Sequence, residues 1–140
     1  MFSNITLSEQ LECNTVGRIF EKAAVSLHCY ETTFCAAWLK SDLCKRILSM
    51  EESLACQSIT CLLDSFTREL KIPQHDKYHM NKDVMYWLGY MLTYWMLSDK
   101  TTDELLLKQY NIGRILEDYD ILHVMPMDAV IKTIKQDYIV

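Results

Sequence analysis

Glycine and proline are scarce in this sequence, which has three glycines and two prolines among 140 residues. Folds with many short strands depend on these two residue types for their tight turns, so such folds are disfavoured. The few glycines also form no loop of the kind that cradles a phosphate group. Hydrophobic residues make up 50% of the chain and charged residues 24%, as in an ordinary globular domain. The composition therefore favours a single, mainly helical domain.

An excess of positive charge is also lacking, because 14 lysine and arginine residues face 19 aspartate and glutamate residues, for a net charge of −5. Broad binding to a phosphate backbone needs clustered basic residues, so DNA is a less favoured partner. An acidic chain suits a protein partner with a basic surface instead.

No hydrophobic run is long enough to predict a membrane span, and no signal peptide is recognisable at the N-terminus. The longest uncharged stretch, residues 84–98, would reach about 22 Å as a helix with a rise of about 1.5 Å per residue. The hydrocarbon core of a bilayer is roughly 30 Å thick. We therefore expect a cytoplasmic protein with no membrane segment.

All six cysteines lie in the first half of the chain. An even number of cysteines predicts disulfides in a secreted protein, but no secretory signal accompanies these. They fall mostly at apolar positions of helical patterns, so we interpret them as buried thiols in a reducing cytosol. The cysteines are Cys13, Cys29, Cys35, Cys44, Cys56 and Cys61.

The most distinctive stretch, residues 83–97, predicts a helix that is apolar on two neighbouring faces. Residues four apart share a face, and the two stripes are Tyr86, Tyr90 and Tyr94, and Trp87, Met91 and Trp95. Such a helix is stable only when it is covered on several sides. It is therefore the central helix of a bundle, or it lies in an interface. That interface is formed with a second copy of the chain in a homodimer or with another protein. Tyr90 and Tyr94 are the predicted contact residues, because tyrosine is enriched in interfaces.

Helical periodicity predicts helices along most of the chain, with Thr6-Leu7-Ser8-Glu9 as a capping box before the first helix and Thr32 or Thr33 as the cap of the second. The expected helices span residues 7–29, 32–39, 42–48, 58–70, 83–97, 101–110, 111–116 and 126–138, with a polar linker over 73–82 and a loop over 118–125.

The order of these helices indicates an internal repeat. An offset of 68 residues relates Arg46-Ile47-Leu48 to Arg114-Ile115-Leu116 and maps residues 19–29 onto residues 87–97. The alternative is that two runs of short helices look alike by chance. We predict an all-α, compact helical bundle of two pseudo-repeated units, residues 1–72 and 83–140, packed with their first helices adjacent.

The second half resembles a family of short, uncharacterised bacterial proteins. The residues that carry the resemblance are Tyr86-Trp87-Leu88-Gly89-Tyr90-Met91, Tyr94-Trp95, Thr101-Thr102-Asp103-Glu104-Leu105, Ile115-Leu116, Tyr119, Leu122-His123 and Ala129-Val130-Ile131-Lys132. Members of this family are often encoded beside putative toxins in mobile elements. The resemblance therefore implies an antitoxin-like or regulatory role.

Two groups of residues suggest other chemistry. The spacing of Cys56, Cys61, His75 and His79 is close to that of a zinc finger, in which two thiolates and two imidazoles bind the metal. Two buried thiols and two linker histidines are the alternative interpretation. His123 lies near carboxylates and is a candidate base, although such a histidine more often orders a loop through backbone carbonyls.

Acidic residues occur at corresponding places in the two units, namely Glu51, Glu52, Glu117, Asp118 and Asp120. They are typical of a solvated face, or alternatively they bind a basic protein by complementary charge.

Our leading hypothesis is a non-catalytic protein that needs no cofactor and acts by stoichiometric binding, as an antitoxin-like protein or a phage or mobile-element inhibitor. The alternatives are a zinc-binding module and a DNA-binding regulator, the latter using Lys40, Lys45, Arg46, Lys108 and Arg114.

Overall fold

The protein is an all-α bundle in a computed structural model that describes residues 5–51, 54, 57–75, 77–100 and 108–140. The described helices are α1 (Leu7–Ser26), α2 (Glu31–Lys40), α3 (Asp42–Leu48), α5 (Ile59–Glu69), α6 (Lys82–Asp99), α8 (Ile112–Glu117), α9 (Tyr119–Leu122) and α10 (Met127–Asp137). Within these ranges the only β-type pairing is a single antiparallel bridge between Tyr110 and Ile139. The predicted all-α fold class is confirmed.

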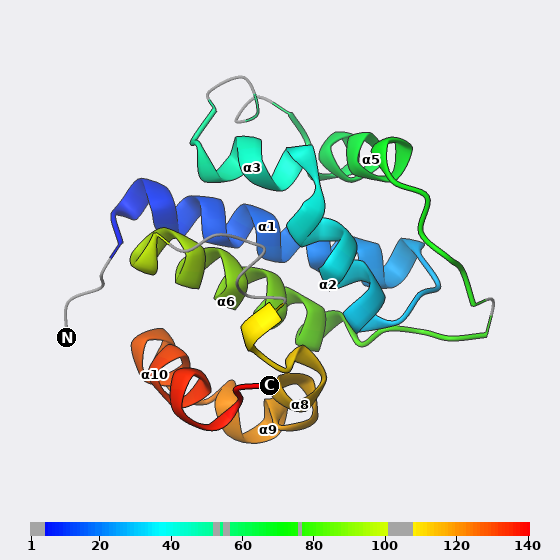
Figure 1. The fold of residues 1–140 in the computed structure, drawn as a ribbon. Coiled ribbons are helices and arrows are strands. Elements are labelled where there is room, and N and C mark those ends of the chain that lie inside the picture. Colours follow the sequence, from blue (N-terminus) through cyan, green and yellow to red (C-terminus); the bar gives the residue numbers. More distant parts are fainter. Residues whose placement is uncertain (1–4, 52–53, 55–56, 76, 101–107) are drawn as a thin grey trace.

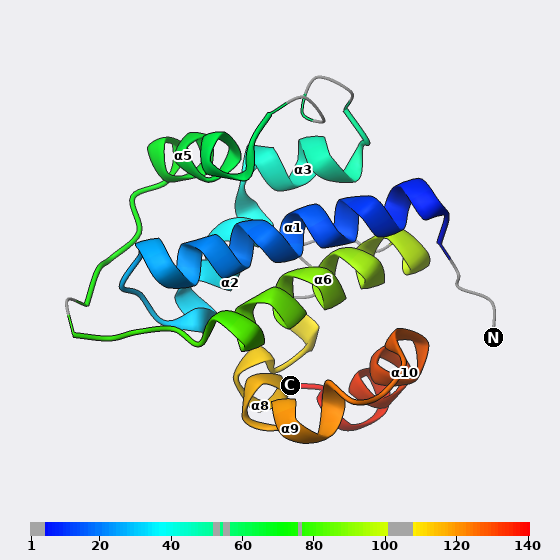
Figure 2. The ribbon, with the colours of Figure 1, turned by 180° about the vertical axis from the view of Figure 1, so that it is seen from behind.

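The two long helices, α1 and α6, form the centre of the bundle and run antiparallel (Figures 1 and 2). They approach closely because a glycine lies on each helix at the crossing. A Cβ atom on Gly17 would lie 2.8 Å from the Tyr86 ring, and one on Gly89 would lie 2.8 Å from the Phe20 ring. The two glycines therefore allow the aromatic rings of the partner helix to pack directly against the backbone.

Short helices lie on both sides of this central pair. In both views, α3 and α5 lie on one side of α1 and α6, and α8, α9 and α10 lie on the other side (Figures 1 and 2). The bounds of α5 and α10 differ by 68 at both ends, since 127 − 59 = 68 and 137 − 69 = 68. This offset agrees with the predicted repeat for these two helices, and the repeat as a whole stays a prediction, because the counterpart of α2 falls mainly on residues 101–107, outside the described ranges.

Helix α6 is mostly covered by its own chain. Eleven residues of α6 are buried, including Trp87 and Trp95. The buried residues of both halves belong to one hydrophobic core cluster. A homodimer through residues 83–97 stays a prediction, and the part of α6 that remains for it is the half-buried stripe of Tyr86 and Tyr90.

The helix ends confirm several predictions and correct others. The Thr6 hydroxyl accepts from the backbone N–H of Glu9, whose carboxylate accepts from the Thr6 N–H, as expected of a capping box. Helix α2 begins at Glu31 after Tyr30, which makes no side-chain cap, so the prediction that Thr32 or Thr33 begins it is wrong. The expected loop at 118–125 contains the short helix α9. The helix expected over residues 101–110 lies mainly outside the described residues.

The predicted linker over residues 73–82 forms no helix or strand at residues 73–75 and 77–81, and α6 already begins at Lys82, but hydrogen bonds hold the linker against the turn between α1 and α2. The His75 N–H donates to the His28 carbonyl at 2.5 Å, and the His28 N–H donates to Gln74 Oε1 at 2.8 Å. The Tyr78 hydroxyl also donates to Glu31 at the start of α2. The segment between the two units is therefore part of the packed structure.

The cysteine prediction is confirmed for four residues. Cys13, Cys29, Cys35 and Cys44 are buried, whereas Cys61 is exposed. Burial raises the pKa of Cys13 and Cys35 to about 12 and that of Cys29 to about 11, with smaller effects from nearby charges. These three thiols therefore stay protonated near neutral pH. Cys56 lies outside the described residues.

None of the helices in the described ranges has the combined length and hydropathy that a membrane span requires.

Candidate functional site: an aromatic groove

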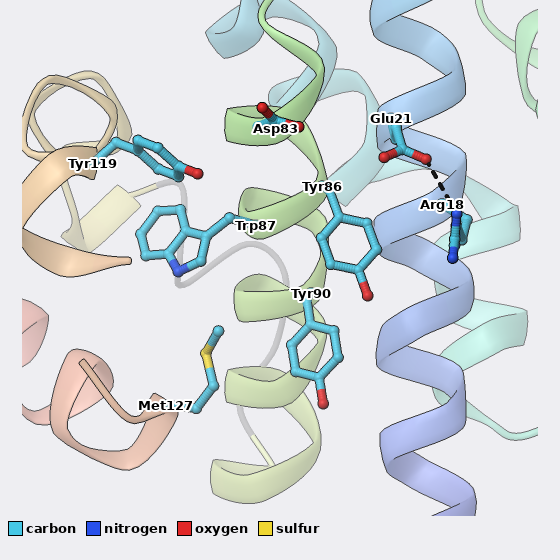
Figure 3. Close-up of a pocket in the computed structure, with 8 residues that line it drawn as sticks. All are labelled: Arg18, Glu21, Asp83, Tyr86, Trp87, Tyr90, Tyr119 and Met127. Atoms are coloured by element: carbon cyan, nitrogen blue, oxygen red, sulfur yellow. Dashed lines mark ion pairs between the residues drawn. The ribbon is translucent and has the colours of Figure 1, made fainter. Parts of the chain in front are cut away.

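A groove lies over the exposed face of α6, between α1 on one side and α9 and α10 on the other (Figure 3). It encloses about 560 Å³, a volume within the usual range of ligand pockets. The residues that line it are Arg18, Glu21, Asp83, Tyr86, Trp87, Tyr90, Tyr119 and Met127. We call this feature the aromatic groove.

Contacts with α1 hold the tyrosines on one side of the aromatic groove in place. The Tyr86 hydroxyl donates to Asn14 Oδ1 at 2.5 Å. The Arg18 guanidinium lies 6.0 Å from the centre of the Tyr86 ring and 3.5 Å from the Glu21 carboxylate. The Tyr90 ring lies next along the helix, with its centre 6.2 Å from that of Tyr86. Tyr86 and Tyr90 are both half-buried, so part of each ring faces the groove.

The opposite side of the aromatic groove is a stack of three rings. The Trp87 indole packs edge to face against Tyr119, with ring centres 5.5 Å apart, and Tyr119 stacks on His123 at 4.3 Å. His123 Nδ1 lies 2.8 Å from the Tyr119 carbonyl oxygen. The prediction that His123 orders its loop through a backbone carbonyl is therefore confirmed.

The α9 end of the aromatic groove is negatively charged. Burial raises the pKa of Tyr119, and the negative charges of Asp83 and then Asp120 raise it further. Both carboxylates therefore act on the Tyr119 hydroxyl, one from the first turn of α6 and the other from α9. At the α1 wall, Arg18 and Glu21 largely neutralise each other.

One polar group that lines the aromatic groove has no hydrogen-bond partner. The Trp87 side chain is only 6% exposed, and its Nε1–H donates to no group among the described residues. In Figure 3 the indole nitrogen points towards Met127 at the α10 side of the groove. An unsatisfied buried donor costs about 1–3 kcal/mol. Trp38 has a similar unpaired Nε1–H, but its ring is packed among the phenylalanines of the core.

The structure separates the two predicted contact tyrosines. Tyr90 lines the aromatic groove. Tyr94 is 5% exposed, and its hydroxyl donates to Asp128 of α10 at 2.7 Å, so its ring lies beneath α10. Only Tyr90 is placed to contact a partner without movement of a helix.

The predicted acidic residues do not form one patch. Glu51 follows α3 and binds Arg46 at 2.7 Å, on one side of the central helix pair, and Glu52 lies outside the described residues. On the other side, Asp118 accepts from the Tyr138 hydroxyl at 2.5 Å. Exposed Glu117 and Asp120 complete the predicted set there. Of the whole set, Asp120 is the residue whose charge reaches the aromatic groove.

The basic positions of the DNA-binding alternative are also divided between the two sides. Lys40, Lys45 and Arg46 belong to α2 and α3, whereas Lys108 and Arg114 belong to the second half. The Arg114 guanidinium lies 5.1 Å from the centre of the Tyr138 ring. Arg46 is paired with Glu51, as described above. These side chains do not gather into one basic surface.

The predicted zinc ligands do not meet where they are described. Cys61 is exposed in the first turn of α5. The His75 ring lies 4.4 Å from that of Tyr30, and the His79 ring lies 5.0 Å from that of His28. The described residues contain no group of three or more histidine, cysteine, aspartate or glutamate side chains arranged to hold a metal ion. The fourth predicted ligand, Cys56, lies outside those residues.

The sequence reasoning missed Trp87, Tyr119, Asp83 and Met127 as groove residues. Asp83, Trp87 and Tyr90 occur at intervals of three and four, which places them on neighbouring faces of one helix. That spacing was a usable signal. Tyr119 and Met127 come from separate helices, so no spacing along the chain relates them to α6.

No protein family, no curated protein and no solved structure matches this chain. The chemistry of the aromatic groove is therefore argued from its own residues.

Proposed function

We propose that this protein is a non-catalytic binding protein that acts by stoichiometric association with another protein, and that the aromatic groove is its contact surface. The observation that carries the proposal is a set of tyrosine, tryptophan and methionine side chains that line an open groove on the central helix.

The residue types in the groove support this role. Tyrosine, tryptophan and methionine are enriched at the centres of protein interfaces, where tyrosine and tryptophan contribute most of the binding free energy. The groove is also preorganised, since Tyr86 is held by Asn14 and Tyr119 is held between Trp87 and His123. Rings that are already ordered lose little conformational entropy when a partner binds.

The biological form of this binding is proposed to be inhibition or antitoxin-like neutralisation. The resemblance of the second half to proteins encoded beside putative toxins supports this form. The aromatic groove belongs mainly to that half, because six of its eight lining residues lie at or after Asp83. The net charge of −5 is consistent with a partner that presents a basic surface.

The test compares two tyrosine-to-alanine variants in affinity purification from source cells, followed by native mass spectrometry. Tyr90→Ala removes a ring from the groove. Tyr30→Ala removes a partly exposed ring that lies outside it and serves as the matched control. We expect wild type and Tyr30→Ala to retain one protein at a fixed molar ratio, and Tyr90→Ala to retain at least about tenfold less, as for loss of about 1.4 kcal/mol.

Circular dichroism and thermal unfolding of each variant show whether it is folded. Equal retention of every protein by folded Tyr90→Ala and wild type would overturn the groove as the contact surface. Absence of any protein at a fixed ratio would overturn stoichiometric binding.

A further inference from the structure

The charge that is left uncompensated in the aromatic groove is negative. No hydrogen bond or ion pair joins the carboxylate of Asp83 or Asp120 to another described side chain, and both residues are exposed. Arg18 is the basic residue of the lining, and it is paired with Glu21. A cationic group is therefore the complementary ligand for the α9 end.

Aromatic faces next to these carboxylates favour the same kind of ligand. Trp87 and Tyr119 lie at the α9 end, and Figure 3 shows the Tyr119 hydroxyl on the side of Asp83. Trp87 is buried, so the half-buried ring of Tyr119 is the one that a ligand can reach, and an aromatic ring attracts a cation. A guanidinium group suits such a site better than an ammonium group, because it is planar, stacks on rings and binds carboxylates through two parallel hydrogen bonds.

The unpaired Trp87 N–H indicates a second property of the ligand, because the ligand must supply a hydrogen-bond acceptor. It points towards Met127, whose unbranched and flexible side chain is able to move aside. A simple cation supplies no acceptor at this point. A peptide supplies a backbone carbonyl together with the charge of its side chain, and so meets both requirements.

We propose that the aromatic groove binds an arginine-bearing segment of the partner protein. The guanidinium lies at the α9 end, beside Asp83 and Asp120 and against the accessible part of the Tyr119 side chain. A backbone carbonyl of the same segment accepts from Trp87 Nε1–H. This inference rests on the proposed function, because it identifies the chemistry of the partner at the same site.

The first experiment titrates the protein with N-acetyl-arginine N-methylamide and with the corresponding citrulline compound, which has nearly the same shape without the charge. The signals are the indole N–H resonances of the ¹⁵N-labelled protein, in which Trp87→Phe identifies the Trp87 resonance. We expect the arginine compound to shift the Trp87 resonance and to leave that of core Trp38 in place. The citrulline compound should bind at least about tenfold more weakly.

The second experiment repeats the arginine titration with the double variant Asp83→Asn, Asp120→Asn and with Asp64→Asn as the matched control. Asp64 is an exposed aspartate on α5, on the other side of the central helix pair. We expect the double variant to weaken binding about tenfold and Asp64→Asn to leave it unchanged. Added salt should weaken binding to wild type, because the charges are partly exposed.

Equal shifts with arginine and citrulline, or an unchanged affinity in the double variant, would overturn the guanidinium site. A Trp87 resonance that does not respond to the arginine compound would overturn the whole inference. If Tyr90→Ala still abolishes retention of a partner in that case, the proposed function stands and only the arginine-bearing ligand is wrong.

Discussion

The two halves of the protein place their aromatic residues differently. In the first half, Phe20, Phe34, Trp38 and Phe66 contact one another at ring-centre distances of 4.8–5.5 Å, and each is at most 1% exposed. In the second half, a comparable set of rings lines the aromatic groove. The same order of helices therefore supports a closed aromatic core in one half and an accessible aromatic surface in the other.

The repeat that the sequence predicts relates individual positions of the two halves. The first half has a smaller groove at the corresponding place, of about 360 Å³, lined by Arg18, Glu21, Lys22, Val25, Ile59 and Lys82. With the offset of 68, Lys22 corresponds to Tyr90 and Ile59 corresponds to Met127. A basic side chain thus stands where the second half has a ring. The two grooves therefore differ in the chemistry of the groups that they are able to bind.

The largest expected difference between the halves is in stability. Phe66→Ala removes a fully buried ring from the first-half core and should lower the free energy of unfolding by about 3–5 kcal/mol. Tyr90→Ala removes a half-buried ring at the groove and should lower it by about 1 kcal/mol or less. Urea unfolding followed by circular dichroism measures both values. An equal loss of the free energy of unfolding in the two variants would show that the Tyr90 ring contributes to the hydrophobic core as much as Phe66 does.

A smaller effect is expected at the crossing of α1 and α6, which joins the halves. Gly89→Ala places a Cβ atom 2.8 Å from the Phe20 ring and 3.0 Å from the Val16 carbonyl oxygen, and should destabilise the protein by about 1–3 kcal/mol. Gly113→Ala is the matched control, because a Cβ atom there meets only Asn111 Oδ1, at 3.4 Å. It should be neutral or stabilising by up to about 1 kcal/mol, since alanine favours a helix. Thermal unfolding of both variants tests this difference, and a stable Gly89→Ala variant would contradict the close crossing.

The smallest effect per pH unit is a loss of stability at high pH, to which the buried thiols of the first half contribute together with Tyr78 and Tyr138, whose pKa is also raised to about 12 by hydrogen bonds to carboxylates. The unfolded chain ionises its thiols near pH 9, whereas burial raises the pKa of Cys35 in the folded protein to about 12. The folded state therefore keeps a proton that the unfolded state loses, so stability is complete below about pH 9 and falls as the pH rises towards 12. Each such thiol contributes a slope of up to about 1.4 kcal/mol per pH unit.

Urea unfolding between pH 8 and pH 10.5 under reducing conditions measures this slope. Cys35→Ala should make the slope shallower, and Cys61→Ala, at an exposed position, should leave it as in wild type. The account of the buried thiols would be wrong if the two variants had the same slope.

Much of the fold could be predicted from the sequence because its signals are local. The capping residues Thr6, Ser58 and Asn81 each accept hydrogen bonds from the first turn of the helix that they precede. The helical period of residues 83–97 predicted a covered helix, and Trp95 within it is 1% exposed. The start of α2 was predicted incorrectly, because a threonine within its first turn resembles a cap in sequence.

The candidate site was predicted only in part. Tyr90 and Asp120 were expected to contact a partner, and the structure places Tyr90 in the aromatic groove and the charge of Asp120 at its α9 end. Tyr94 shares the stripe of Tyr90, but α10 covers it. Whether a residue of this stripe is open or covered depends on where α10 lies, and no local pattern in α6 contains that information.

By itself, the sequence determined which segments are helical and which helix must be covered. These properties depend on periodicity, capping and side-chain hydrophobicity, all of which act over a few residues. Only the tertiary structure decided that Asp83, Trp87, Tyr119 and Met127 meet in one groove and that the acidic residues are divided between two sides. Contacts of this kind depend on how separate helices pack, because α1, α6, α9 and α10 each supply part of the lining.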